Sequence, residues 1–435
     1  MHQKNKKEQL LTDLSIKSNY EFKIMDKLLV GISKFLKEGP IGIYLMAFLI
    51  PLNPRMLGFA VAIIIVEQLI RSPKIDKTHF KSQLSWRNPG VWLLLFYLMH
   101  FVGLINTENM GFAKMDLGMK ASLGIFPVFF MLYKVKVNWK LFVKAFIVGA
   151  FMSILINAGF SMVIYNEKRH TYYITGERLS HMMHRGYWAT YLVLTYFLLL
   201  KQMIASKSKK SFLLNLLGAL LMIIFIMASG AKVGFIILFF VSVWGVFSLF
   251  NRFRNKWILP SAFVVIALTI TSVYYFIPSI SHRVTEALSV FTEPIESFDK
   301  VKPESTTARI MLWDSSRELI MENFWWGVGT GDVKDELIKR NYEKGYIGVA
   351  EQKLNSHFQF LNSHIAIGVF GSLFLLLSVI MNYLKQKPDE FRAWRIGIIT
   401  ILFIAMLPES MLETQAGIIP YAFLFTFLPS FKPKQ

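Results

Sequence analysis

Long apolar runs with few or no charged residues recur along the whole chain, and they constrain the fold more than any other feature. Residues 212–229, "FLLNLLGALLMIIFIMAS", form one such run. A helix of about 20 mostly apolar residues crosses a bilayer. Only 17% of the residues are charged, whereas soluble domains carry about 25%. The sequence therefore predicts an all-α, polytopic membrane protein. Its roughly twelve apolar segments lie at 33–52, 56–70, 89–105, 115–133, 141–164, 186–200, 211–229, 232–250, 257–278, 364–384, 393–407 and 413–430.

The charges of the connecting segments predict the orientation of the chain. Every second connection is rich in Lys and Arg: "RSPKIDKTHFKSQLSWR", "YKVKVNWK", "KQMIASKSKK", "NRFRNK" and "KQKPDEFRAWR". Because cytoplasmic loops carry an excess of these residues, we expect both termini to be cytoplasmic. The net charge of +20 is then explained by the Lys and Arg residues of the cytoplasmic loops. It therefore gives no support for nucleic-acid binding. The lack of cysteine excludes disulfides and thiolate catalysis.

One outward segment is far longer and more hydrophilic than the others, and it divides the chain. We expect residues 1–278 to hold the N-terminal cytoplasmic segment and transmembrane helices 1–9. Residues 279–363 form the large outward loop, and residues 364–435 hold helices 10–12 and a cytoplasmic tail. Within the loop, "TTARIMLWDSSRELIMENFW" has apolar residues at helical spacing, and "GDVKDELIKRNYEKG" has the pattern of a helix ending at a glycine. The loop is therefore predicted to be a small helical cap.

Three motifs have both a structural and a functional interpretation. "WWGVGTGD", at 325–332, lacks the preceding strand of a nucleotide-binding loop, so a tight turn between two loop helices is predicted. "HMMH", at 181–184, has two imidazoles at metal-ligand spacing but no third ligand nearby, and we predict no metal site. His357 and His364 lie about two helical turns apart, on one face of a helix that becomes apolar. Alone, they can be interfacial histidines bonded to loop backbone.

Two cations favour a functional interpretation of these histidines. Arg309 lies in the same outward loop, and Lys232, in "ASGAKVGF", lies at the outer end of an otherwise apolar helix. An ionisable residue at such a position indicates a functional site, although snorkelling to the interface is a competing explanation. Cations and a histidine at the outer bilayer face form a plausible site for an anionic lipid headgroup.

The sequence around His357 resembles a known motif. His357-Phe, nine further residues and Gly368-Val-Phe-Gly371 are similar to the histidine-centred motif of the O-antigen ligase and polymerase superfamily. In that motif the histidine is usually followed by Asn, Ser or Gln. Phe358 departs from this pattern, and the polar residues Asn355 and Ser356 precede the histidine instead.

Other stretches resemble the same superfamily in the same order. Arg309 and Trp313 take the positions of its R-x-x-x-W element, and the glycines from Gly327 to Gly331 take those of its glycine turn. Lys232 stands where the family usually carries arginine, which keeps the charge but loses the bidentate fork. "HRGYWATYL", at 184–192, resembles the segment that leads into the sixth helix.

The resemblance implies a GT-C-like glycosyltransferase of lipopolysaccharide biosynthesis in the cell inner membrane, with a periplasmic active site and no metal or cofactor. The donor would be a glycan on undecaprenyl diphosphate, and the acceptor a sugar hydroxyl of lipid A-core. His357 would be the general base, and Arg309 and Lys232 would hold the diphosphate.

The remaining candidates for substrate binding are Arg178, Arg185, Trp313 and His364; for His364, a structural role is the alternative. Within the superfamily, a repeat-unit polymerase or a protein O-oligosaccharyltransferase remains open, because the motifs do not distinguish acceptors. From another class, secondary transporters also have twelve helices with both ends inside, but they are built from repeats with charges near the midplane, and no matching halves are evident here.

Overall fold

The computed structural model describes residues 40–71, 74–168, 176–253, 257, 264, 271, 294–385, 388–430 and 432–433. The N-terminal cytoplasmic segment, most of the predicted span at 257–278 and the first part of the outward loop lie outside the described residues. The helices are α2 (Ile41–Leu49), η1 (Pro54–Met56), α3 (Leu57–Arg71), α4 (Lys77–Gln83), α5 (Pro89–Val102), α6 (Met110–Lys120), α7 (Ser122–Leu132), α8 (Trp139–Lys168), η3 (Gly176–Leu179), α9 (Arg185–Ala205), α10 (Lys209–Ser229), α11 (Lys232–Phe253), η4 (Ile295–Ser297), α14 (Ser305–Glu322), α15 (Val333–Glu343), α16 (Ile347–Glu351), α17 (Gln359–Ile367), α18 (Val369–Lys385), α19 (Arg392–Ala405), η5 (Met411–Glu413) and α20 (Gln415–Ser430). Two short strands, β1 (Lys136–Val137) and β2 (Lys432–Pro433), pair in parallel.

The described chain is almost entirely helical and carries apolar helices long enough to cross a membrane. Five such helices occur among the described residues, at Met110–Leu132, Trp139–Lys168, Arg185–Ala205, Lys209–Ser229 and Lys232–Phe253. Pro89–Val102 and Val369–Lys385 are apolar but shorter. The all-α class and the integral membrane character are thus confirmed, whereas the count of twelve spans stays a prediction.

The predicted span at 364–384 is divided in the structure. Gly368, with φ of +66°, separates α17 from α18. A Cβ atom at this position would lie 2.1 Å from the carbonyl oxygen of Trp325. The hydropathy pattern does not predict this break, because the residues on both sides of Gly368 are equally apolar.

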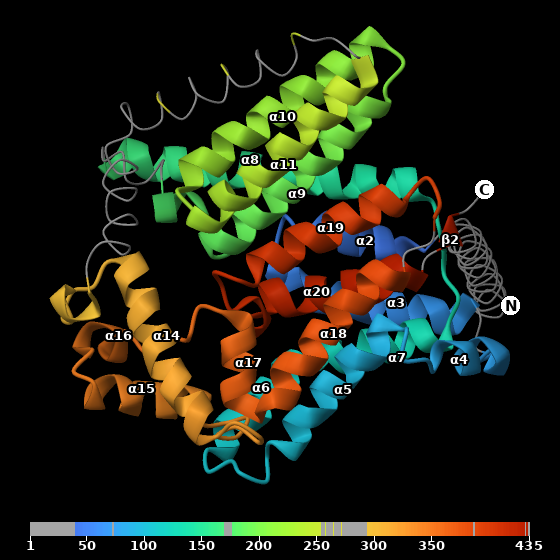
Figure 1. The fold of residues 1–435 in the computed structure, drawn as a ribbon. Coiled ribbons are helices and arrows are strands. Elements are labelled where there is room, and N and C mark those ends of the chain that lie inside the picture. The colour runs from blue at the N-terminus through green and yellow to red at the C-terminus, as the bar shows by residue number, and fades with distance from the viewer. Residues whose placement is uncertain are drawn as a thin grey trace, which may run out of the picture.

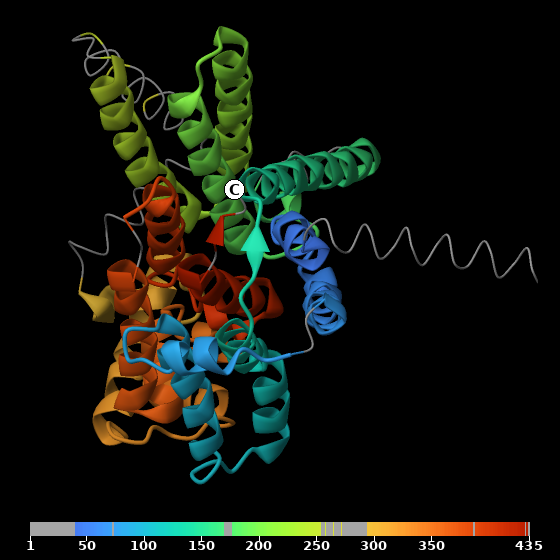
Figure 2. The ribbon, with the colours of Figure 1, turned by 90° about the vertical axis from the view of Figure 1, so that its right-hand side faces the viewer.

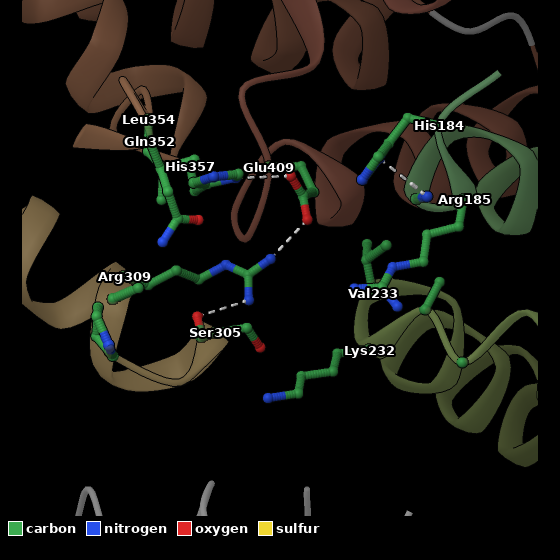
Figure 3. Close-up of a pocket in the computed structure, with 15 residues that line it drawn as sticks. His184, Arg185, Lys232, Val233, Ser305, Arg309, Gln352, Leu354, His357 and Glu409 are labelled. Atoms are coloured by element: carbon green, nitrogen blue, oxygen red, sulfur yellow. Dashed lines mark hydrogen bonds and ion pairs between the residues drawn. The ribbon is translucent and has the colours of Figure 1, made fainter. Parts of the chain in front are cut away.

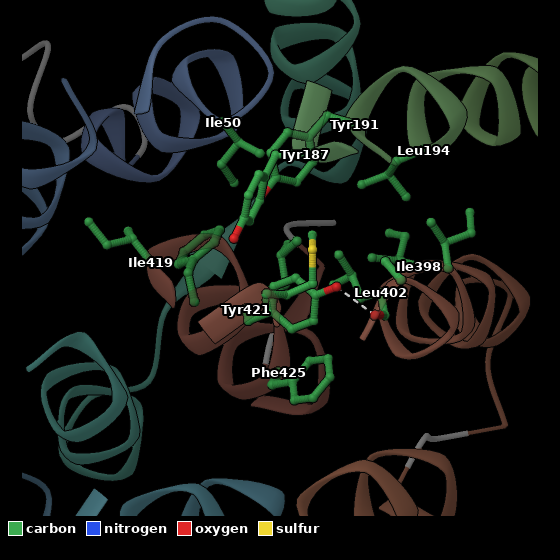
Figure 4. Close-up of a cluster of buried hydrophobic side chains, with 14 of the residues drawn as sticks. Ile50, Tyr187, Tyr191, Leu194, Ile398, Leu402, Ile419, Tyr421 and Phe425 are labelled. Atoms are coloured by element: carbon green, nitrogen blue, oxygen red, sulfur yellow. Dashed lines mark hydrogen bonds between the residues drawn. The ribbon is translucent and has the colours of Figure 1, made fainter. Parts of the chain in front are cut away.

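The core of the bundle lies around α9 and α20, which are buried along most of their length. Hydrogen bonds from buried tyrosines to main-chain carbonyls join α20 to both α9 and α19. The hydroxyl of Tyr191 donates to the carbonyl oxygen of Ala416. The hydroxyl of Tyr421 donates to the carbonyl oxygen of Leu402 in α19 (Figure 4). Because both of these tyrosine hydroxyls have an acceptor, the two aromatic side chains are buried without the cost of an unpaired hydroxyl.

Residues 294–363, the described part of the predicted outward loop, are mostly helical and are called the cap below; that the loop faces outward stays a prediction. Helices α14 and α16 enclose a small separate core around Met311, Leu312 and Val349. The cap lies at one end of the molecule, and α10 projects at the opposite end (Figures 1 and 2). The glycine stretch lies between α14 and α15, and the amide of Val328 bonds to Ile365. The interpretation of this stretch as a tight turn is confirmed.

Candidate active site

A polar cavity of about 270 Å³ lies where the cap meets the bundle (Figure 3). Its walls are the N-terminal ends of α9 and α11, the start of α14 and the loop that precedes α17. Glu409, in the connection between α19 and α20, completes the lining. Of the residues predicted from the sequence, His357, Arg309, Lys232 and Arg185 all line this cavity.

His357 enters the cavity from a loop with an unusual backbone. Its φ is +47°, in the left-handed region that non-glycine residues seldom adopt. The side chain of Asn355 accepts a hydrogen bond from the amide of His357 at 3.0 Å, and Phe358 then caps α17. Such backbone outliers cluster at functional sites, where the surrounding structure holds them in place.

Glu409 connects His357 with Arg309. Its Oε1 accepts from Arg309 Nη2 at 2.6 Å, and its Oε2 lies 3.0 Å from His357 Nδ1. Figure 3 shows both side chains directed toward this carboxylate. Burial raises the pKa of Glu409, but the hydrogen bond from His357 and the charge of Arg309 outweigh it and hold the pKa below its ordinary value. Because an ionised carboxylate only accepts, Nδ1 donates to it, and in the neutral form of the ring Nε2 is then the acceptor.

The opposite wall of the cavity is positively charged. Arg185 and Lys232 are the first residues of α9 and α11, and helix N-termini add partial positive charge to that of the side chains. Gly230, with φ of +63°, ends α10 and makes the turn that leads to Lys232. Lys232 Nζ donates to Thr306 Oγ1 at 2.6 Å, which links α11 to the cap. The wall suits an anionic group such as a phosphate.

Three predicted site residues lie outside the cavity lining. Trp313 Nε1 donates to the carbonyl of Ser356 at 3.0 Å, so it supports the loop next to His357. His364 lies 3.0 Å from the carbonyl of Phe324 through Nε2 and 3.1 Å from Ser372 through Nδ1. His364 thus contacts a main-chain carbonyl and a serine hydroxyl, and its role stays a prediction. Arg178 is exposed in η3.

Sequence reasoning missed Glu409 and assigned no role to His184. Glu409 lies 52 residues from His357 and 100 from Arg309, and the only signal is a carboxylate between two apolar segments. The two histidines of "HMMH" separate: His184 lines the cavity, whereas His181 bonds to Ser161. Within the described part of the chain, no three His, Asp or Glu groups gather as they would to hold a metal ion.

The structure is that of a helical integral membrane protein with a cavity lined by cations, histidines and a carboxylate where the cap meets the bundle. Residues 217–376 match the family model described as O-antigen ligase. The match includes Lys232, Arg309 and His357, and it ends before Glu409. It implies a glycosyltransferase-like membrane enzyme that acts on lipid-linked glycans. No curated protein matches the chain.

Proposed function

We propose that the protein is an O-antigen ligase. It moves a glycan from undecaprenyl diphosphate to a sugar hydroxyl of lipid A-core at the periplasmic face of the inner membrane. The observation that carries the proposal is the convergence of His357, Arg309 and Lys232 on one polar cavity, from three elements within the matched domain. Residues 279–363 then supply the base and the arginine, α11 supplies Lys232, and the connection between α19 and α20 supplies Glu409.

The positive wall binds the diphosphate of the donor. When the bond between sugar C1 and the diphosphate oxygen breaks, negative charge develops on the leaving group. Lys232, Arg185 and the two helix N-termini are in place to stabilise that charge before the reaction starts. Arg309 donates to Glu409 and to the carbonyls of Ser305 and Pro408, and the remaining N–H groups of its guanidinium can donate to the phosphates.

His357 activates the acceptor. Its Nε2 takes the proton of the sugar hydroxyl as that oxygen bonds to C1 of the donor and the diphosphate leaves. Glu409 holds the ring through Nδ1 and stabilises the imidazolium that forms. The reaction requires no metal, because guanidinium, ammonium and imidazole groups cover both the leaving group and the proton.

A repeat-unit polymerase and a protein O-oligosaccharyltransferase would use the same chemistry on other acceptors. The match to a ligase domain does not favour secondary transport. The three acceptors give different products, so one assay distinguishes them.

The test uses the purified full chain in nanodiscs with a fluorescent glycan on undecaprenyl diphosphate, in the presence of EDTA. We expect transfer to lipid A-core, a loss of donor binding and turnover in Lys232→Ala, and substantial activity in Lys232→Arg. Elongation of the donor glycan without lipid A-core would indicate a polymerase instead. No transfer to any acceptor, or activity that only Mg²⁺ restores, would contradict the proposal.

A further inference from the structure

A second cavity, of about 260 Å³ and with both polar and apolar lining, lies beside the loop that also lines the first. It is lined by α6, the glycine turn, the first turns of α15, α17 and the same loop that precedes α17. None of the residues predicted from the sequence lines it, and the chemistry proposed above does not use it. A transferase that joins two large glycans needs a second subsite, so this cavity requires an explanation.

The two cavities share two walls. In the loop before α17, Leu354 and His357 line the first cavity, whereas Lys353 and Asn355 line the second. The connection before α20 supplies one carboxylate to each, Glu409 to the first and Glu413 to the second. His357 thus stands in the partition, and Asn355 holds its amide from the side of the second cavity.

The inner part of the second cavity contains a buried ion cluster. Lys120 Nζ lies 2.7 Å from Asp116 and 3.2 Å from Glu413, and the side chain of Lys120 is 4% exposed. A buried charge persists only when partners compensate it, and here two carboxylates share one ammonium. Their remaining lone pairs can accept hydrogen bonds from hydroxyl groups. Asn355 and Asn362 add amide donors and acceptors beside the cluster.

The outer part of the second cavity is cationic. Lys334 and Lys353 line it and are both exposed. Lys353 has φ of +52°, so the loop holds a lysine in a backbone conformation that favours glycine. Hydroxyl acceptors inside and ammonium groups outside fit a sugar that carries a negative charge.

We propose that the second cavity is the acceptor subsite, and that it binds an anionic terminal sugar whose reacting hydroxyl is presented past Asn355 to His357. This inference rests on the proposed function. It assigns the donor diphosphate and the acceptor glycan to separate cavities with the base between them.

The experiment measures two dissociation constants on the full chain in nanodiscs. The probes are undecaprenyl diphosphate and a deacylated oligosaccharide with one phosphate monoester. In Lys334→Gln/Lys353→Gln, we expect the dissociation constant of the oligosaccharide to rise roughly three- to tenfold, as for the loss of two exposed ion pairs, and that of undecaprenyl diphosphate to stay unchanged. Lys339→Gln, an exposed lysine of α15 outside the cavity lining, is the matched control.

A second arm isolates the charge. Phosphatase treatment of the oligosaccharide should weaken its binding to the wild type and remove the difference between wild type and double variant. The inference is overturned if the double variant binds the phosphorylated oligosaccharide as the wild type does, if it loses undecaprenyl diphosphate, or if a Ser/Thr-rich peptide competes for the cavity and the oligosaccharide does not. A wild type that fails to bind undecaprenyl diphosphate contradicts the proposed function instead.

Discussion

At the scale of single residues, Glu409 organises the candidate site. It is 12% exposed, and its two oxygens engage the proposed base and one of the proposed diphosphate ligands. A carboxylate in this position fixes which nitrogen of His357 faces the substrate, and it keeps Arg309 directed toward the cavity. Glu409 touches no reacting atom in the proposed mechanism, so it acts as a positioning residue.

Glu409→Gln should lower kcat about 10²-fold, the lower end of what a general base contributes, with a small change in donor KM. The amide keeps the size of the side chain but neither stabilises the imidazolium nor fixes the ring nitrogen that donates. Steady-state transfer kinetics measure this effect. Glu351→Gln, an exposed carboxylate at the end of α16, is the control and should behave as wild type. An unchanged kcat in Glu409→Gln would contradict the proposed positioning role of Glu409.

The depressed pKa of Glu409 predicts how stability depends on pH. Because its folded pKa lies below the ordinary value near 4.5, ionised Glu409 stabilises the fold at neutral pH. This contribution is lost as pH falls through the folded pKa. Thermal unfolding of wild type and Glu409→Gln should therefore show a constant difference in Tm from about pH 7 to pH 5, and a shrinking one at lower pH. A difference that grows on acidification would mean that the carboxylate is not stabilised by its partners.

The two histidines of the sequence motif should differ in effect. His357→Ala should abolish transfer and leave donor binding intact, because the imidazole acts only as the acceptor loses its proton. His364→Ala should retain most activity, since His364 bonds to Phe324 and Ser372 outside the cavity. Glycan transfer and donor affinity, measured for both variants, distinguish the two histidines. If His364→Ala is the less active of the two, the wrong histidine has been assigned.

At the scale of elements, the helices that depend on local sequence patterns could be predicted, whereas contacts between residues far apart in the sequence could not. The apolar runs at 211–229 and 232–250 become α10 and α11, since hydropathy reports such helices directly. The cap helices and the glycine turn followed from helical spacing and stop residues. The contact between Glu409 and His357 could not be found, because nothing local to either residue indicates the other. The break at Gly368 was missed for the reason that neighbouring residues are uniformly apolar.

Gly368→Ala tests how strictly this break is required. The substitution meets two obstacles, a φ of +66° and a contact of 2.1 Å with the main chain at Trp325. Gly345→Ala is the matched control, because its φ of +71° is similar and a Cβ at this position would have no atom within 4 Å. We expect Gly345→Ala to cost about 1 kcal/mol of unfolding free energy, and Gly368→Ala to cost several times more, measured as a fall in Tm. Equal falls would show that the close approach at Gly368 is tolerated.

At the scale of the whole molecule, the direction of the helices relates the cavities to the membrane. Helices α9 and α11 both begin at the first cavity. The connection between α9 and α10 therefore lies one helix length away, and Arg252, near the end of α11, bonds to Ser206 there. A helix of 21 residues is about 30 Å long, which is the thickness of the hydrocarbon core. The cavities and the α9–α10 connection thus fit opposite faces of a bilayer.

Reporter fusions at Lys207 and Lys334 test this arrangement. Lys207 belongs to a basic connection, which favours the cytoplasmic side. Lys334, at the start of α15, lines the second cavity and lies in the cap. We expect a phosphatase reporter to be active after Lys334 and inactive after Lys207, and a cytoplasmic fluorescent reporter to give the reverse. Because α9 joins the two regions by a single crossing, both fusions must give opposite results. A cytoplasmic result at Lys334 would place both cavities on the side where the glycan of the donor is absent, and it would contradict the proposed reaction at its first step.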